Sequence, residues 1–171
     1  LIASLARRDE SVLVEAEALR ALGTLGDHKY LPLVRAAFNK RSYRDVIAAS
    51  GVTALASMRD RKFLGELRKQ SQAHHSFTRR AAAIRAMADY AAISQDVVPF
   101  ICGLVPSDDE RITMVALAAL GQLEDERALP TLEKARKSPN MRVRVYADEA
   151  LARVHAGLEP KKPANAKRSS R

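Results

Sequence analysis

Histidines are the side chains of this sequence that could hold a metal ion, so their spacing is the first test of chemistry. A zinc peptidase site needs two histidines four residues apart on one helix face, with a glutamate as general base. The histidines are His28, His74, His75 and His155, and only His74 and His75 are close in sequence. Neighbouring residues on a helix point about 100° apart, so these two cannot form that pair. We interpret residues 71–76 as an exposed loop between repeats.

Two acidic clusters, residues 108–110 and 124–126, could in principle supply a general acid and a general base. Such a pair must converge in a cleft where the two carboxyl groups have different environments. Both clusters instead precede predicted helices, where free N–H groups and the helix dipole favour negative charge. We find no Gly-rich phosphate loop, no G-x-S-x-G motif and no plausible Cys–His pair. The sequence therefore predicts no catalytic residue, no metal site and no cofactor in this chain.

The composition is that of a folded soluble protein of one domain. The chain has 171 residues, of which 47% are hydrophobic and 29% charged. Aromatic residues make up 5% and there is no tryptophan, so alanine, leucine, valine and isoleucine must fill the core. The single cysteine, Cys102, excludes an intrachain disulfide framework and a Cys-rich zinc site, and we expect it to be a small buried apolar residue.

The sequence contains no sign of a membrane span or of a signal peptide. No apolar run approaches the ~20 residues that cross a bilayer. No charged start, apolar centre and small-residue cleavage site follow one another. These features slightly favour a cytoplasmic location for this fragment, and they leave an upstream signal open. The chain begins at Leu1 in what reads as a helix interior, so we expect it to be part of a longer protein.

A repeat becomes visible when the turn segments 25–32, 58–65, 94–99 and 123–130 are aligned. The shared position is occupied by Pro32, Gly65, Pro99 and Pro130, in steps of 33, 34 and 31 residues. Repeats of this length indicate stacked supersecondary units that bury one another's apolar faces.

An Ala-rich amphipathic helix is predicted before each turn and a second helix after it. Residues 18–23 and 116–121 share the pattern Ala-Leu-x-Ala-Leu-Gly before their turns. Residues 33–38, 64–67, 98–104 and 129–135 are the second helices. Proline fits the first helical turn because its missing N–H costs nothing there. Asp27, Asp60 and Asp125 precede these helices and are predicted to accept hydrogen bonds from free backbone N–H groups.

These patterns predict an all-α chain, an α-α superhelix of about four to five helical hairpins. The repeats are expected at residues 10–41, 42–75, 76–107 and 108–139. Residues 1–9 would end a preceding repeat and residues 140–156 would form a final helix. Residues 157–171 read as a basic disordered tail, which carries +4 of the chain's net charge of +9.

The repeat pattern also resembles a known family. The pattern Val143-Arg144-x-x-Ala147-x-x-Ala150-Leu151, with Ala-Leu-Pro at the turn of residues 128–130, resembles HEAT repeats of the phycobilisome-lyase-like kind. This resemblance implies a HEAT/armadillo-like solenoid, a fold that serves as a scaffold in many settings.

A narrower resemblance concerns the stretch Ser-Tyr-Arg-Asp-Val-Ile at residues 42–47, which enters an Ala-rich helix. It is similar to the C-terminal HEAT region of bacterial aminopeptidase N-like zinc metallopeptidases. In that family the H-E-x-x-H motif and the later glutamate ligand lie well upstream, and this chain contains none of them. The resemblance therefore implies a non-catalytic part that packs on, or narrows access to, a peptidase domain.

The leading hypothesis is a HEAT scaffold whose partner is another protein or an upstream domain of the same chain. The alternative is a nucleic-acid-binding solenoid that holds phosphates against a basic concave face, lined by the second helices, with help from the tail. The candidate contact residues are Arg61, Lys62, Arg68, Lys69, Lys134, Arg136 and Lys137. Glu66, Glu126 and Glu133 interrupt this basic surface and few aromatics could stack on bases, so protein is favoured over nucleic acid as the partner.

Overall fold

The computed structural model describes residues 1–159 as a chain of helices without a β-strand in that range. The helices are α1 (Ile2–Arg7), α2 (Val12–Leu25), α3 (Leu31–Ala36), α4 (Val46–Ser57), α5 (Leu64–Gln70), α6 (Phe77–Ala88), α7 (Val97–Cys102), α8 (Glu110–Leu123), α9 (Leu129–Ala135) and α10 (Met141–Leu158). The predicted all-α class is confirmed.

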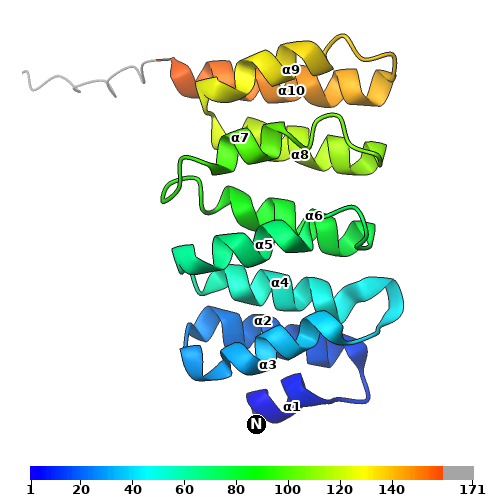
Figure 1. The fold of residues 1–171 in the computed structure, drawn as a ribbon, viewed down its shortest axis with the longest axis vertical. Coiled ribbons are helices and arrows are strands. Elements are labelled where there is room, and N and C mark those ends of the chain that lie inside the picture. Colours follow the sequence, from blue (N-terminus) through cyan, green and yellow to red (C-terminus); the bar gives the residue numbers. More distant parts are fainter. Residues whose placement is uncertain (160–171) are drawn as a thin grey trace, which may run out of the picture.

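The helices form two layers that run the length of the stack (Figure 1). Helices α2, α4, α6, α8 and α10 contact one another in that order and make the first-helix layer. Helices α3, α5, α7 and α9 make the second-helix layer and contact mainly the first-helix layer. The predicted α-α solenoid is therefore confirmed, while the division into the four repeats given above stays a prediction.

Small residues bring the first-layer helices close together. A Cβ atom added to Gly23 in α2 would lie 2.4 Å from the Cα and carbonyl oxygen of Ala54 in α4. A Cβ atom added to Gly121 in α8 would lie 2.8 Å from the Cα of Ala150 in α10. The Ala-Leu-Gly pattern thus sets the distance between neighbouring helices, because only a residue without a side chain fits at these crossings.

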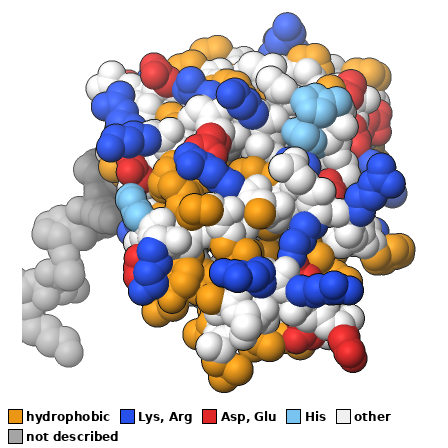
Figure 2. Space-filling model, turned by 60° about the horizontal axis from the view of Figure 1, so that its bottom comes forward, with side chains coloured by type: hydrophobic (Ala, Val, Ile, Leu, Met, Phe, Trp, Pro, Cys, Tyr) orange, Lys and Arg blue, Asp and Glu red, His pale blue; other side chains and the backbone are white. Residues whose placement is uncertain are grey.

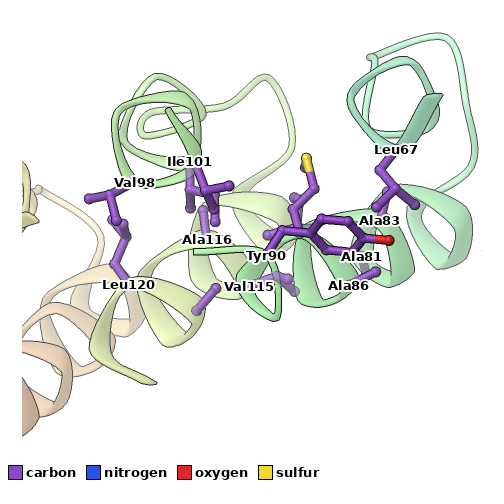
Figure 3. Close-up of a cluster of buried hydrophobic side chains, with 14 of the residues drawn as sticks. Leu67, Ala81, Ala83, Ala86, Tyr90, Val98, Ile101, Val115, Ala116 and Leu120 are labelled. Atoms are coloured by element: carbon purple, nitrogen blue, oxygen red, sulfur yellow. The ribbon is translucent and has the colours of Figure 1, made fainter. Parts of the chain in front are cut away.

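The hydrophobic core lies between the two layers (Figure 3). Leu67 of α5 and Ile101 of α7 face Ala83 of α6 and Ala116 of α8, and all four are buried. Tyr90, just after α6, is buried and donates a hydrogen bond from its hydroxyl to the carbonyl of Ala56, at 3.3 Å. Burial raises the pKa of Tyr90 to about 12. The ring of Tyr90 therefore fills core volume, and its hydroxyl group connects the turn after α6 to α4.

Aspartates cap three of the turns as the sequence predicts. The carboxylates of Asp27, Asp60 and Asp125 each accept a hydrogen bond from the backbone N–H two residues later, at 3.0, 2.9 and 2.9 Å. Each capped turn is a short 3-10 helix that leads into α3, α5 or α9. The third turn departs from this pattern, because Asp96 makes no side-chain cap at the start of α7.

The residue just before each of these capping aspartates, one or two residues after a first helix, adopts left-handed backbone angles. Gly26 has φ 68°, while Arg59 has φ 51° and Glu124 has φ 50°. A side chain makes this conformation unfavourable by roughly 1 kcal/mol, and glycine does not carry that cost. The second and fourth repeats therefore hold a strained position where the first has glycine.

Removing the glycine at Gly26 and introducing one at Arg59 should change the stability of the fold in opposite directions. We expect Gly26→Ala to lower the free energy of unfolding by about 1 kcal/mol, because the added Cβ meets no atom within 4 Å and only the backbone conformation is penalised. Arg59→Gly should raise the free energy of unfolding by up to about 1 kcal/mol. Urea titrations followed by circular dichroism would measure both values. A loss of stability in Arg59→Gly would contradict the explanation.

Two expectations need adjustment at the C-terminal side. Cys102 is half-buried rather than buried, because it is the last residue of α7 and packs against the core from its edge. Helix α10 continues to Leu158, so Gly157 and Leu158, which we assigned to the tail, belong to the helix. Glu159 of the predicted tail follows the helix directly, and residues 160–171 lie outside the described residues. Within residues 1–159 no helix has both the length and the apolar character needed to cross a membrane.

Candidate interaction surfaces

A trough crosses the first-helix layer from α4 to α10. It consists of two adjoining hollows of about 340 and 380 Å³, which share Arg85 and Gln122 as lining residues. The first hollow is lined by Phe77, Arg85, Arg111, Met114, Val115, Ala118, Ala119, Gln122 and Tyr146. The second is lined by Thr53, Ala56, Ser57, Ala82, Arg85, Ala86, Asp89 and Gln122. All these residues come from the first helices or from the residue that follows one.

Small and large side chains line the trough together. The small ones include Ala82 and Ala86 of α6 and Ala118 and Ala119 of α8. Met114 and Tyr146 supply apolar and aromatic surface, and Gln122 supplies an amide. A surface that combines a flexible thioether, an aromatic ring and scattered polar groups is typical of protein contact sites.

Charges in the trough differ in how firmly they are held. Arg111 makes two hydrogen bonds to Asp109, at 3.0 and 2.7 Å, and its guanidinium lies 4.5 Å from the ring centre of Phe77. The hydrogen bonds from Arg111 lower the pKa of Asp109, which stays ionised. Arg85 is exposed and takes part in none of the ion pairs among residues 1–159. Arg85 is therefore the cation of the trough that is available to a partner.

The seven basic residues predicted as a contact surface lie elsewhere. They belong to the second helices or to the turns beside them: Arg61, Lys62, Arg68, Lys69, Lys134, Arg136 and Lys137. Figure 2 shows that Lys and Arg side chains on the visible face, which includes the N-terminal end, are scattered among hydrophobic and other side chains. Arg136 is already engaged, because its Nε lies 2.9 Å from Asp148.

The structure brings some of these predicted residues into hollows of the second-helix layer. Arg68 and Lys69 line one hollow, of about 410 Å³, between α5 and α7. Lys134 lines another, of about 240 Å³, beside Val105 and Val143. The remaining four residues line neither of these two hollows.

Two adjacent arginines that the sequence analysis did not single out connect successive repeats. Arg79 and Arg80 lie near the start of α6 and both are buried. Arg79 donates hydrogen bonds to the side-chain oxygen of Gln70 and, at 3.0 Å, to the carbonyl of Phe38. Arg79 therefore contacts the preceding repeats, and its burial lowers the pKa of its guanidinium.

Arg80 points to the following loop. Its Nε donates to the carbonyl of Ser71 at 3.2 Å, and its Nη2 donates to Asp108 at 2.8 Å and to the hydroxyl of Ser107 at 3.1 Å. The Ser107 hydroxyl also donates a hydrogen bond to Asp108, at 2.8 Å. The hydrogen bond from Arg80, and after it the one from Ser107, lower the pKa of Asp108 to about 2. Asp108 is thus a structural partner of Arg80. The predicted capping is done by Asp109 of the same cluster, which accepts a hydrogen bond from the backbone N–H of Arg111 at 2.9 Å.

The histidines lie apart from any cluster of possible metal ligands. His74 and His75 lie in the turn after α5, with ring centres 3.9 Å apart and ring planes tilted by 50°. Partial burial, together with Arg79 nearby, lowers the pKa of His75. Among residues 1–159, no three His, Cys, Asp or Glu side chains are grouped so that they could hold a metal ion.

Comparisons with known proteins agree with this architecture. The profile of the HEAT repeats family matches residues 62–152, and that of the PBS lyase HEAT-like repeat matches residues 14–40. Among solved structures, a designed armadillo repeat protein is similar at a TM-score of 0.52 and 20% sequence identity, over 90% of this chain and 80% of that one. Human deoxyhypusine hydroxylase in complex with glycerol aligns at 14% identity, over 91% of this chain and 84% of that one, with a TM-score of 0.38. No curated protein matches the sequence.

Proposed function

Because the chain belongs to the HEAT-repeat family, we propose that it is a non-catalytic scaffold that binds a segment of another protein, or of another domain, in the trough of its first-helix layer. One observation carries this proposal. The two hollows share Arg85 and Gln122 and so offer one continuous surface that α4, α6, α8 and α10 build together.

The chemistry of the trough suits an extended segment better than a small molecule. Its lining comes from several repeats, so a ligand must reach across helices to use all of it. Met114 and Tyr146 provide apolar contacts, while Gln122 and Arg85 provide polar ones. Since Arg85 has no carboxylate partner among the described residues, an acidic side chain of the partner would gain a new ion pair there.

A peptide-display selection on the 171-residue chain would test the proposal. Selected peptides should cause NMR shift changes at residues that line the trough, Gln122 and Tyr146 among them. Arg85→Glu should weaken their binding by roughly tenfold or more, because it turns an attractive contact into a repulsive one.

Arg61→Glu is the matched control, since it makes the same charge reversal at an exposed residue of the second-helix layer. We expect this variant to bind as the unchanged chain does. The proposal fails if the selected peptides map to another face, or if both variants weaken binding equally.

The parentage in an aminopeptidase N-like zinc metallopeptidase is a finer proposal, supported by the resemblance of residues 42–47 alone. In that segment Tyr43 is exposed, and Arg44 and Asp45 both have positive φ angles. Reading the gene upstream of Leu1 tests the proposal. An open frame with H-E-x-x-H supports it, and a start codon beside Leu1 removes it.

Nucleic-acid binding is the alternative proposal, supported by the exposed Arg61, Lys62 and Lys69 of the second-helix layer. Affinity for duplex DNA should then fall steeply as salt rises. A chain that does not bind the duplex at low ionic strength would exclude it.

A further inference from the structure

The hollow between α5 and α7 is a separate site on the opposite side of the molecule from the trough. It is lined by Arg68, Lys69, Ser71, Gln72, Ala73, Arg80, Phe100, Gly103, Leu104, Pro106, Ser107 and Asp108. Phe100, Leu104 and Pro106 supply its apolar lining. Arg68 and Lys69, from the end of α5, supply its positive charge.

Arg68 is held in place without a counter-ion. Its guanidinium carbon lies 5.0 Å from the ring centre of Phe100, a cation–π distance. Its Nη2 makes one long hydrogen bond of 3.4 Å to the carbonyl of Asp96, and its Nε is buried with no hydrogen-bond partner in the described part of the chain. A half-buried guanidinium without a counter-ion is unfavourable, so an anion that meets its terminal nitrogens from the hollow would stabilise it.

The other charges around the hollow leave its positive charge uncompensated. Arg80 already pairs with Asp108, at 2.8 Å, so these two charges offset each other. Lys69 is exposed and, like Arg68, belongs to none of the ion pairs among residues 1–159. The net local charge is therefore positive, next to a floor that is apolar.

We propose that this hollow binds an acidic peptide segment of a partner, with an aliphatic side chain on Phe100, Leu104 and Pro106 and an adjacent carboxylate on Arg68 and Lys69. The carboxylate would pair with the terminal nitrogens of a guanidinium that Phe100 already orients. The aliphatic side chain would cover the apolar floor, which inorganic phosphate could not do. The trough plays no part in this proposal, so the two can fail separately.

Fluorescence anisotropy with the 171-residue chain and a short labelled peptide, one leucine flanked by glutamates, tests the site. We expect binding that weakens by roughly tenfold or more when glutamine replaces the glutamates, and similarly when serine replaces the leucine. Arg68→Gln and the exposed Lys69→Glu should each weaken binding of the unchanged peptide, and NMR shifts should locate the peptide at residues 68–73 and 103–108.

Lys137→Glu is the matched control, because Lys137 is an exposed cation of the same layer that does not line this hollow. It should bind the peptide as the unchanged chain does. Since Lys69 is exposed, Lys69→Glu keeps the test decisive even if Arg68→Gln disturbs the fold. The proposal is overturned if all peptides bind with equal affinity, or if Lys69→Glu and Lys137→Glu lose the same affinity. It is also overturned if the chain binds inorganic phosphate or duplex DNA in preference to the peptide.

Discussion

Gly23→Ala is expected to lower the free energy of unfolding by roughly 2–3 kcal/mol, although alanine is the better helix former. The added Cβ would lie 2.4 Å from the Cα and the carbonyl oxygen of Ala54. Backbone atoms cannot rotate out of the way as a flexible side chain can, so α2 must move away from α4. That movement opens the contact that joins the first repeat to the second.

Gly65→Ala is the control for helix propensity. A Cβ at Gly65 in α5 meets no atom within 4 Å, so this substitution should raise stability by up to about 1 kcal/mol. Urea titration of both variants gives the two values. Hydrogen exchange should show the loss in Gly23→Ala concentrated in α1 to α3, because each repeat contacts only its neighbours. Equal and small effects at Gly23 and Gly65 would contradict the close approach of α2 and α4.

The helical stack could be predicted from local signals that recur along the chain. The Ala-Leu-Gly pattern, the prolines at residues 32 and 130 and the capping aspartates each specify a short-range event. These events repeat in the same order, and a repeated unit of this kind has one way to bury its apolar face. The fold class was therefore predictable from one sequence.

The interaction surfaces depend on longer-range geometry. The trough needs residues of α4, α6, α8 and α10 to lie side by side, and none of its lining residues carries a distinctive motif. The signal that is visible in the sequence is instead positive charge, and the basic residues predicted from it belong to the second helices or to the turns beside them. Of that basic set, Arg68 and Lys69 line the hollow between α5 and α7. Phe100 lines the same hollow, and charge alone could not identify it as part of a site.

One signal for Arg80 was present in the sequence. Arg80 lies four and seven residues before Ile84 and Met87, which are buried on the core-facing side of α6. A charged residue at core spacing requires partners, because burying it without them is costly. What the spacing could not show is that those partners, Ser71 and Asp108, come from the loops on either side of the repeat.

Among the charged residues that join successive repeats, we expect Arg80→Met to lower the free energy of unfolding the most. Methionine keeps the apolar stem, but it leaves the carbonyl of Ser71 without its donor and Asp108 without its cation. Since Asp108 is more than half exposed, water replaces part of the loss, and we expect a drop of about 2 kcal/mol in the free energy of unfolding. Arg80→Lys should recover little, because an ammonium cannot reach several acceptors at once as the guanidinium does.

Arg85→Met is the control on the same helix. Arg85 is exposed and makes no ion pair within residues 1–159, so its replacement should change stability by less than about 0.5 kcal/mol. Thermal and urea unfolding of the three variants would rank them. If Arg85→Met costs as much as Arg80→Met, the hydrogen bonds to the loops are not the cause.

The contact between Arg80 and Asp108 also predicts that the stability of the fold decreases in acid. Hydrogen bonds from Arg80 and Ser107 lower the pKa of Asp108 from 3.8 to about 2 in the folded chain. A carboxyl group with a lowered folded-state pKa stabilises the fold above its unfolded pKa, near 3.8, and that contribution is lost as the pH falls towards 2. In Arg80→Met the pKa of Asp108 should return towards 3.8, because the first of its two stabilising donors is gone. NMR titration of the Asp108 carboxyl carbon measures this directly, and an unchanged pKa in the variant would show that Arg80 does not hold the carboxylate.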